Sequence, residues 1–166
     1  DPARAPCPIL RGGGQERGWR GGTPALPAIA GFAAAVRVTL AERTQTNARL
    51  AALRDAIEAA ARESGAVICG EAAPRIANTT CLALPGRGAE AQVIALDLAG
   101  YAVSAGAACS AGKVAQSHVL AAMRLGALAG QAIRVSLPWN VTEAEIAGFI
   151  AAHRTLAAGR PPGRAA

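Results

Sequence analysis

The sequence predicts an α/β domain whose small sheet is covered by helices on one face, preceded by one long helix. Residues 23–64 repeat apolar side chains with a helical period, whereas residues 65–158 alternate short β-branched runs with helical segments. Hydrophobic residues make up 52% of the chain but aromatic residues only 3%. The core is therefore expected to consist of small side chains, which favours closely packed helices.

The N-terminal third is predicted to be an irregular segment that leads into a helix. Residues 1–22 are rich in proline and glycine, and Thr23 followed by Pro24 is typical of a helix start. One apolar helix face is formed by Leu50, Leu53, Ile57 and Ala61. The opposite, polar face is expected to carry Arg49, Arg54, Asp55, Glu58 and Arg62. The polar residues 42–47 leave open whether this is one helix or two, and Gly65 is expected to end it.

The following residues are predicted to form a compact unit of short strands and helices. Ser117 is a candidate N-cap, and Thr142 with Glu145 forms a candidate capping box. Strands are expected at 67–69, 78–84, 101–104 and 132–137, and helices at 89–99, 117–125 and 142–158. Residues 159–166, rich in proline, glycine and arginine, are expected to be a frayed tail.

Charge and hydropathy exclude two classes of partner. The net charge of +6 is typical of nucleic-acid binding, but the 17 basic residues are scattered and stacking aromatics are rare, so no nucleic-acid partner is expected. No apolar run approaches the roughly 20 residues of a membrane span, so no membrane association is expected either.

The four cysteines form no CxxC pair, which argues against a zinc site and favours a reducing cytoplasmic location. Cys69 and Cys81 lie in strand-like apolar contexts and are interpreted as small buried residues. Cys7 receives no role. Cys109 differs, because it lies in a loop of very small residues close to Lys113. That loop is either a flexible turn with a free thiol or the carrier of a nucleophile whose thiolate is favoured by nearby positive charge.

Two further segments contain candidate binding residues. The glycine-rich residues 12–22, with Arg17 and Arg20, are either a phosphate-binding loop or a simple connection. In the strand predicted at 132–137, alternation places Arg134 on the face opposite Ile133 and Val135. An arginine in that position either grips a carboxylate or forms a structural ion pair.

These segments occur in the order found in one enzyme family. GGGQERG with the following Thr23, the ACSAGK segment around Cys109, SHVLAAM, and IRVS followed by the TEAEI helix resemble the NifS/IscS-type cysteine desulfurases over residues 12–150. These are pyridoxal-phosphate enzymes of the class V aminotransferase group, with the aspartate-aminotransferase fold. The SHVLAAM continuation resembles the branch with the longer cysteine loop.

The resemblance implies a fold for each part of the chain. Residues 1–22 would belong to the large cofactor domain, 23–64 would be the connecting helix or helix pair, and 65–158 the small domain with the cysteine loop. The cofactor lysine of the family precedes the glycine-rich loop, and Lys113 follows the nucleophile, so it does not match that lysine. The chain therefore resembles the C-terminal fragment of a desulfurase, and we expect it to be inactive alone.

The resemblance also implies residue roles. Cys109 would be the catalytic cysteine, which takes sulfur from L-cysteine as a persulfide and releases L-alanine. Arg134 would bind the substrate carboxylate, and Thr23 the cofactor phosphate of the neighbouring subunit in a homodimer. Sulfur would pass to an iron–sulfur scaffold or another acceptor for cluster assembly or thiolation, and Cys109 would also ligate iron in a transient [2Fe-2S] cluster shared with the scaffold.

The sequence departs from the family pattern at Gln116, Arg124 and Pro138–Trp139, which leaves the three site residues in place. His118 is interpreted first as a helix-start residue and second as an acid–base group. Two alternatives stay open at this stage: a selenocysteine lyase of the same fold group, and a non-catalytic interaction fragment that docks on a complete desulfurase or a scaffold.

Overall fold

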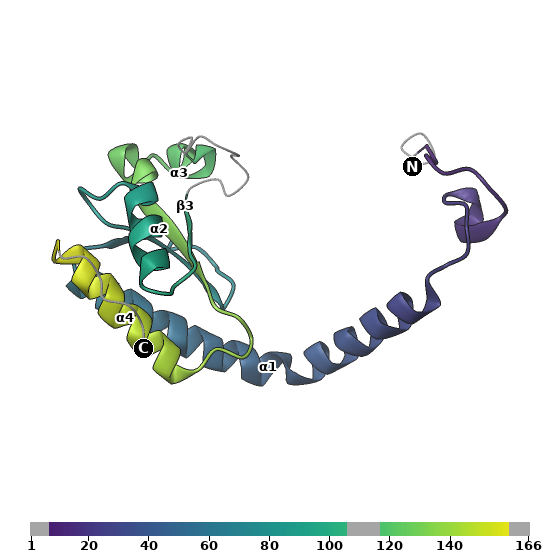
Figure 1. Cartoon of the computed structure of the whole chain (residues 1–166), viewed down its shortest axis with the longest axis horizontal. Coiled ribbons are helices and arrows are strands. Elements are labelled where there is room, and N and C mark those ends of the chain that lie inside the picture. Colours follow the sequence, from purple (N-terminus) through teal and green to yellow (C-terminus); the bar gives the residue numbers. More distant parts are fainter. Residues whose placement is uncertain (1–6, 106–116, 160–166) are drawn as a thin grey trace. The chain divides into compact units, whose positions relative to one another are not determined.

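The computed structural model describes residues 7–105 and 117–159, and the chain divides into two units, Asp1–Arg43 and Thr44–Ala166 (Figure 1). Each unit is described by itself. The elements are the 3₁₀ turn η2 (Gln15–Gly18), α1 (Leu26–Glu63), β1 (Val67–Ile68), β2 (Thr79–Ala83), α2 (Ala89–Leu98), β3 (Ser104–Ala105), α3 (His118–Ala122), the 3₁₀ helix η3 (Gly126–Gly130), β4 (Ala132–Ser136) and α4 (Glu143–Ala157).

In the first unit, the glycine-rich segment folds into a loop that closes on itself. The Gly21 amide donates to the Leu10 carbonyl at 2.9 Å, and the backbones of Gly12 and Gly21 approach so closely that a Cβ on Gly21 would lie 2.8 Å from the Gly12 nitrogen. Within η2, Glu16 and Arg17 both have positive φ, at 54° and 58°. A side chain at the point where these two backbone segments approach would clash, so Gly12 and Gly21 are required there for steric reasons.

Helix α1 is one helix of 38 residues that runs without a break through residues 42–47. The predicted apolar face is confirmed, because Leu50, Ile57 and Ala61 are buried and Leu53 packs against the same core. The predicted N-cap at Thr23 is wrong, because the helix begins at Leu26. Pro24 and Pro27 both lack an amide hydrogen, which shifts the first helical hydrogen bond to Ile29, whose amide donates to Ala25.

The second unit is built on a four-stranded antiparallel sheet in the order β1-β2-β4-β3. Strands β2 and β4 are central, and their register sets Cys81 opposite Arg134 and Leu82 opposite Ile133. Strand β3 pairs with the other edge of β4, so Ser104 also lies opposite Arg134. The α/β class is confirmed, with a purely antiparallel sheet.

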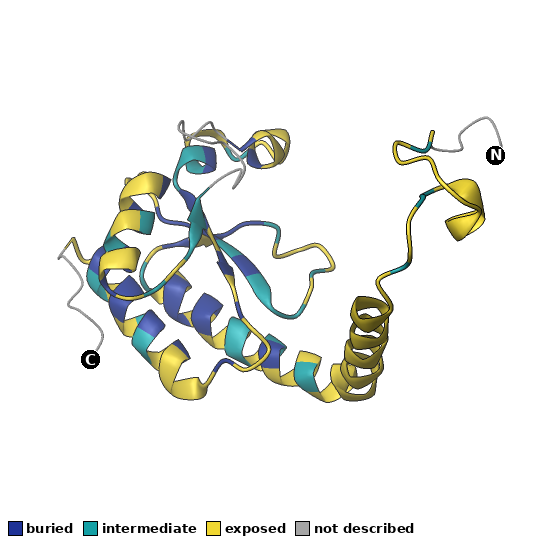
Figure 2. Ribbon diagram, turned by 45° about the vertical axis from the view of Figure 1, so that its right-hand side comes forward, coloured by how far each residue is buried: buried dark blue, intermediate teal, exposed yellow. Residues whose placement is uncertain are grey.

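One face of the sheet carries the main core. It packs against α2, α4 and the C-terminal part of α1, as the buried positions of Figure 2 show. The most buried large side chains at this face are Ile57, Leu82, Leu96 and Ile133. The expectation that helices cover one face only is incomplete: α3 and η3 pack on part of the opposite face, where Ala83, Leu120, Ala129 and Ala132 form a second, smaller cluster.

Most predicted elements are found with shifts of one or two residues, and two are wrong. The third strand is Ser104–Ala105 and not 101–104, because Tyr101 packs its ring on Phe149 of α4 at a centroid distance of 5.7 Å. The helix after Ser117 ends at Ala122, since Arg124 has a positive φ of 59°, and η3 follows. The capping box is confirmed, with the Thr142 hydroxyl accepting from the Glu145 amide at 3.2 Å.

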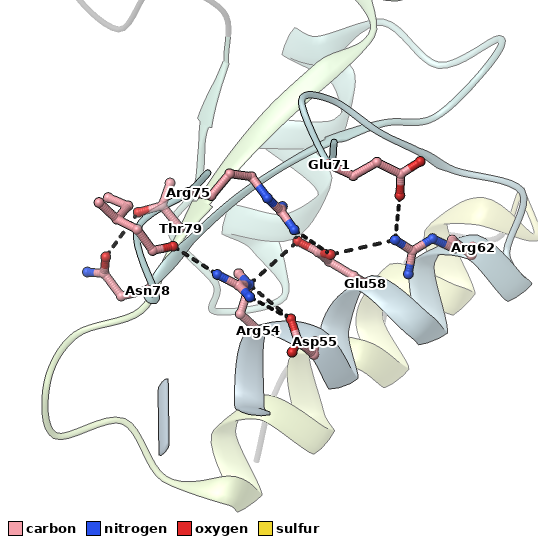
Figure 3. A network of polar contacts seen from close by, with 9 residues as sticks. Arg54, Asp55, Glu58, Arg62, Glu71, Arg75, Asn78 and Thr79 are labelled. Carbon is pink, nitrogen blue, oxygen red and sulfur yellow. Dashed lines mark hydrogen bonds and ion pairs between the residues drawn. The ribbon is translucent and has the colours of Figure 1, made fainter. Parts of the chain in front are cut away.

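A buried carboxylate on α1 fixes the loop between β1 and β2 (Figure 3). Glu58 is 3% exposed, although its position in the helix pattern predicts the polar face. The Arg75 guanidinium donates to its two oxygens at 2.5 and 3.2 Å, and Arg54 and Arg62 lie 3.8 and 3.7 Å away. Burial raises the pKa of Glu58, but the hydrogen bond and the charge of Arg75, with a smaller effect of Arg54, outweigh burial and hold the pKa below its ordinary value of 4.5.

Arg75→Ala is expected to lower the free energy of unfolding by about 2–4 kcal/mol, because it leaves the Glu58 carboxylate buried without its bidentate partner. Arg154→Ala is the matched control: it breaks an ion pair with Glu63 that is exposed on both sides, and should cost less than about 1 kcal/mol. Urea denaturation followed by circular dichroism measures both. Equal losses in the two variants would show that the buried Glu58–Arg75 pair contributes no more to stability than the exposed pair.

The buried His153 side chain is expected to make the stability of the fold depend on pH. It is 2% exposed, its Nε2 atom has no hydrogen-bond partner, and burial lowers its pKa below 6.5. The unfolded chain therefore binds this proton more readily, so stability is complete above about pH 6.5 and falls as the pH drops below it. His153→Phe should flatten that loss between about pH 6.5 and 5, whereas the exposed His118→Gln should not. Thermal midpoints across this range with unchanged slopes in both variants would contradict the assignment.

Candidate functional site

A cavity of about 450 Å³ lies on the sheet face that carries Cys81 and Arg134, opposite the main core. Its walls come from β2 and β4, the loop from Cys69 to Ile76, and α3 with its flanking residues Ser117 and Met123. The side chains used below are Cys69, Arg75, Cys81, Met123 and Arg134. A second cavity of about 490 Å³ on the main-core side is lined mainly by apolar residues around Tyr101 and Phe149.

Arg134 is the charged side chain that β4 presents to the cavity. The predicted alternation is confirmed: Ile133 and Val135 are 0% and 5% exposed, while Arg134 and Ser136 are exposed. The guanidinium donates to the Ser104 hydroxyl at 3.4 Å. Among the residues that the structure describes, no carboxylate lies within ion-pair distance of it, so a structural ion pair does not account for Arg134. Its fork is available to an anionic ligand in the cavity.

Two thiols lie beside this arginine. Cys69 and Cys81 face each other across β1 and β2, and the Cys69 amide donates to the Cys81 carbonyl at 2.8 Å. The neighbouring Cys69 thiol, together with burial, raises the pKa of Cys81. The expectation that both are small buried strand residues fits Cys69, whereas Cys81 is half-buried, and both also line the cavity.

Cys109 and Lys113 lie outside the described residues. The chain leaves the described part after Ala105, next to Ser104, and returns at Ser117, which is buried, lines the cavity and caps α3 by accepting from the Leu120 amide. The segment that contains Cys109 is therefore preceded, one residue before Ala105, by the hydrogen-bond partner of Arg134, and it is followed by a residue that lines the cavity. His118 is the exposed first residue of α3, as its interpretation as a helix-start residue requires.

Thr23 belongs to the first unit, where it is exposed and lies three residues before α1. The Arg20 guanidinium is turned onto its own backbone and donates to the carbonyls of Gly21, Gly22 and Thr23 at 3.1–3.5 Å. In the part of the chain that the structure describes, the Thr23 hydroxyl makes no hydrogen bond. The Thr23 hydroxyl can therefore still donate to a phosphate, whereas the Arg20 guanidinium already donates to backbone carbonyls.

Sequence reasoning missed Arg75 and the thiol pair as parts of the cavity wall. Arg75 lies in a loop without regular periodicity, and only its ion pair with Glu58 on α1 places it there. The pairing of Cys69 with Cys81 depends on the strand register, which no local motif encodes. The TT–C–L–A alternation of β2 was the one available signal, since it sets Cys81 and Leu82 on opposite faces.

Fold and site together define a small α/β domain whose antiparallel sheet presents an arginine to a cavity. The model of the aminotransferase class-V family matches residues 11–149, and the chain belongs to this family.

Proteins named cysteine desulfurase are similar to this chain in sequence. The chain is 38% identical over 146 residues to a cysteine desulfurase of Rhodobacter capsulatus, covering 87% of this chain and 38% of the relative. It is 40% identical over 142 residues to a cysteine desulfurase of Cereibacter sphaeroides (84% and 36%) and 37% identical to cysteine desulfurase NifS of Azotobacter vinelandii (84% and 35%). The chain thus spans little more than a third of the length of these relatives.

Solved structures agree with this assignment. The X-ray structure of a NifS-like protein from Rickettsia africae matches with a TM-score of 0.77 and 30% identity over 92% of this chain and 40% of that chain. DndA from Streptomyces lividans matches with a TM-score of 0.56 and 30% identity over 78% and 36%. Within the described residues, no helix is both long and apolar enough to cross a membrane.

Proposed function

We propose that this chain is the part of a cysteine desulfurase that binds the substrate carboxylate and carries the sulfur. The complete enzyme converts L-cysteine to L-alanine and holds the sulfur as a persulfide. The observation that supports this most is Arg134: an exposed guanidinium without a carboxylate partner among the described residues. It donates to Ser104, just before the Cys109 segment, and lines a cavity together with Ser117, just after that segment. Relatives named cysteine desulfurase provide the reaction class.

The role of Arg134 is to orient the substrate. A bidentate contact to the α-carboxylate fixes two atoms of L-cysteine and so limits the positions of its sulfur. The weak hydrogen bond to Ser104 keeps the guanidinium on the cavity side of β4 before a substrate arrives. Buried Ile133 and Val135 on either side keep the strand from rotating, which would move the arginine into the core.

The role of Cys109 is nucleophilic. Its thiolate attacks the substrate sulfur, the substrate carbon–sulfur bond breaks, and the sulfur stays on Cys109 as a persulfide while alanine leaves. Cys109 lies four residues beyond Ala105, so an extended chain allows it to reach at most about 14 Å from that residue.

Pyridoxal phosphate is the cofactor that this family implies, and the described residues fit one end of it. The exposed Thr23 hydroxyl, at the end of the glycine-rich loop, suits a phosphate oxygen. When bound, the cofactor supplies an electron sink that makes the substrate carbon–sulfur bond breakable. Lys113, the single lysine of the chain, does not match the cofactor lysine of the family, which precedes the glycine-rich loop, so we assign the covalent anchor of the cofactor to the part of the relatives that this chain does not span.

From the same resemblance we also propose how the complete enzyme is assembled and which kind of protein accepts its sulfur. The complete enzyme would be a cytoplasmic homodimer in which Thr23 reaches the cofactor of the neighbouring subunit. Its sulfur acceptor would be an iron–sulfur scaffold or a thiolation protein, and Cys109 would ligate iron in a transient [2Fe-2S] cluster during transfer.

A chimaera tests the two central roles: residues 11–149 replace the matching part of the Rhodobacter capsulatus relative. Cys109→Ser should abolish sulfide release and leave the visible absorbance of the bound cofactor unchanged, because the thiol acts after substrate binding. Arg134→Ala should weaken L-cysteine binding by roughly 2–4 kcal/mol, because a charged bidentate contact is lost.

Arg62→Ala is the matched control inside the exchanged segment: it removes a half-exposed arginine that does not line the cavity, and it should keep both sulfide release and L-cysteine binding. The unsubstituted chimaera must first bind cofactor and release sulfide. Full desulfurase activity in Cys109→Ser would overturn the assignment of the nucleophile, and unaltered cysteine binding in Arg134→Ala would overturn that of the carboxylate ligand.

A further inference from the structure

Three sulfur-containing side chains from three separate segments line the 450 Å³ cavity. Cys69 follows β1, Cys81 lies in β2 directly across from it, and Met123 follows α3. The terminal methyl of Met123 approaches the residue next to Cys69: it lies 3.5 Å from the position of a Cβ built on Gly70. Neither the family comparison nor the proposed desulfurase chemistry uses any of the three.

We propose that this cavity binds a soft univalent metal ion, Cu(I), through the thiolates of Cys69 and Cys81 and the thioether of Met123. Thiolate and thioether sulfur are the ligands that select Cu(I) over harder ions. The residues that line the cavity include no aspartate, glutamate or histidine, so the described wall offers nothing that favours magnesium, calcium or manganese. With two thiolates, it also falls short of the four ligands of a closed structural zinc site.

The charges of the cavity balance such an ion. Two thiolates and one Cu(I) carry a net charge of −1. Arg75, on the same wall, is neutralised by Glu58, whereas Arg134 has no carboxylate within ion-pair distance among the described residues. Arg134 lies directly opposite Cys81 in the strand register, so its positive charge compensates the complex at close range. The surrounding Ala73, Ile76 and Val119 are apolar and disfavour a strongly hydrated ion.

Binding exchanges protons for the metal without any change of oxidation state. The two thiols release two protons as two copper–sulfur bonds form, and the thioether donates a lone pair without losing a proton. Because two protons leave on binding, affinity should increase with pH.

The test uses the whole 166-residue chain, reduced and anaerobic, in a Cys7→Ser/Cys109→Ser background that removes the other two thiols. Cu(I) is titrated in competition with bicinchoninate. One equivalent should bind in competition with the chelator, and Cys69→Ser or Cys81→Ser should each abolish this binding. Met123→Leu, which keeps the side-chain volume, should weaken it by a smaller factor, and an equal titration with Zn(II) should show weaker retention.

A second readout does not depend on whether the variants fold. In the background chain, Cu(I) should protect both Cys69 and Cys81 from alkylation by iodoacetamide, as seen by peptide mass spectrometry, and Zn(II) should protect them less. Binding that persists in both cysteine variants, or alkylation of Cys69 and Cys81 that Cu(I) does not slow, would overturn the site. Unchanged affinity in Met123→Leu would remove Met123 from the ligand set.

Discussion

The pairing of β2 with β4 is the constraint on which the rest of the second unit depends. Its register places Leu82 against Ile133 on one face and Cys81 against Arg134 on the other. The first pair is completely buried under three helices, and the second opens onto a cavity. A slip of one residue would move the arginine into the core and leave the isoleucine in the cavity, at a cost in stability that makes the observed register the only acceptable one.

Two buried polar interactions, one ion pair and one set of hydrogen bonds, then position the loops next to that sheet. The Glu58–Arg75 pair draws the loop between β1 and β2 onto α1, and the loop in turn lines the Arg134 cavity. Gln92, which is fully buried, donates to the carbonyls of Arg87 and Gln131 and so ties the start of α2 to the residue before β4. Helix packing on one face thus determines the geometry of the opposite face.

How much of this follows from the sequence depends on whether a feature is local. The alternation around Arg134, the apolar face from Leu50 to Ala61 and the capping box at Thr142 are local, and each prediction is confirmed. The burial of Glu58 was not predictable, because its partner lies 17 residues away in a loop without a periodic pattern. The facing cysteines were not predictable for the same reason, since a register joins residues that no motif connects.

The start of α1 shows a local prediction that fails. Thr23 and Pro24 match a helix start, but Pro27 removes another amide and the first regular turn begins at Leu26. Thr23 is left outside the helix with an exposed hydroxyl. The motif that resembles the desulfurases is thus kept in a loop, which leaves this side chain available for the phosphate contact proposed for it.

The central claim is that the β2–β4 register presents Arg134 to the carboxylate of the substrate. The most direct test compares L-cysteine with L-cysteine methyl ester, which lacks that charge, in the chimaera that carries residues 11–149. The account predicts that the unsubstituted protein prefers L-cysteine in kcat/KM, and that Arg134→Gln lowers this value for L-cysteine alone, so that the preference disappears. A variant that keeps the original preference, or that loses activity equally on both compounds, would contradict it.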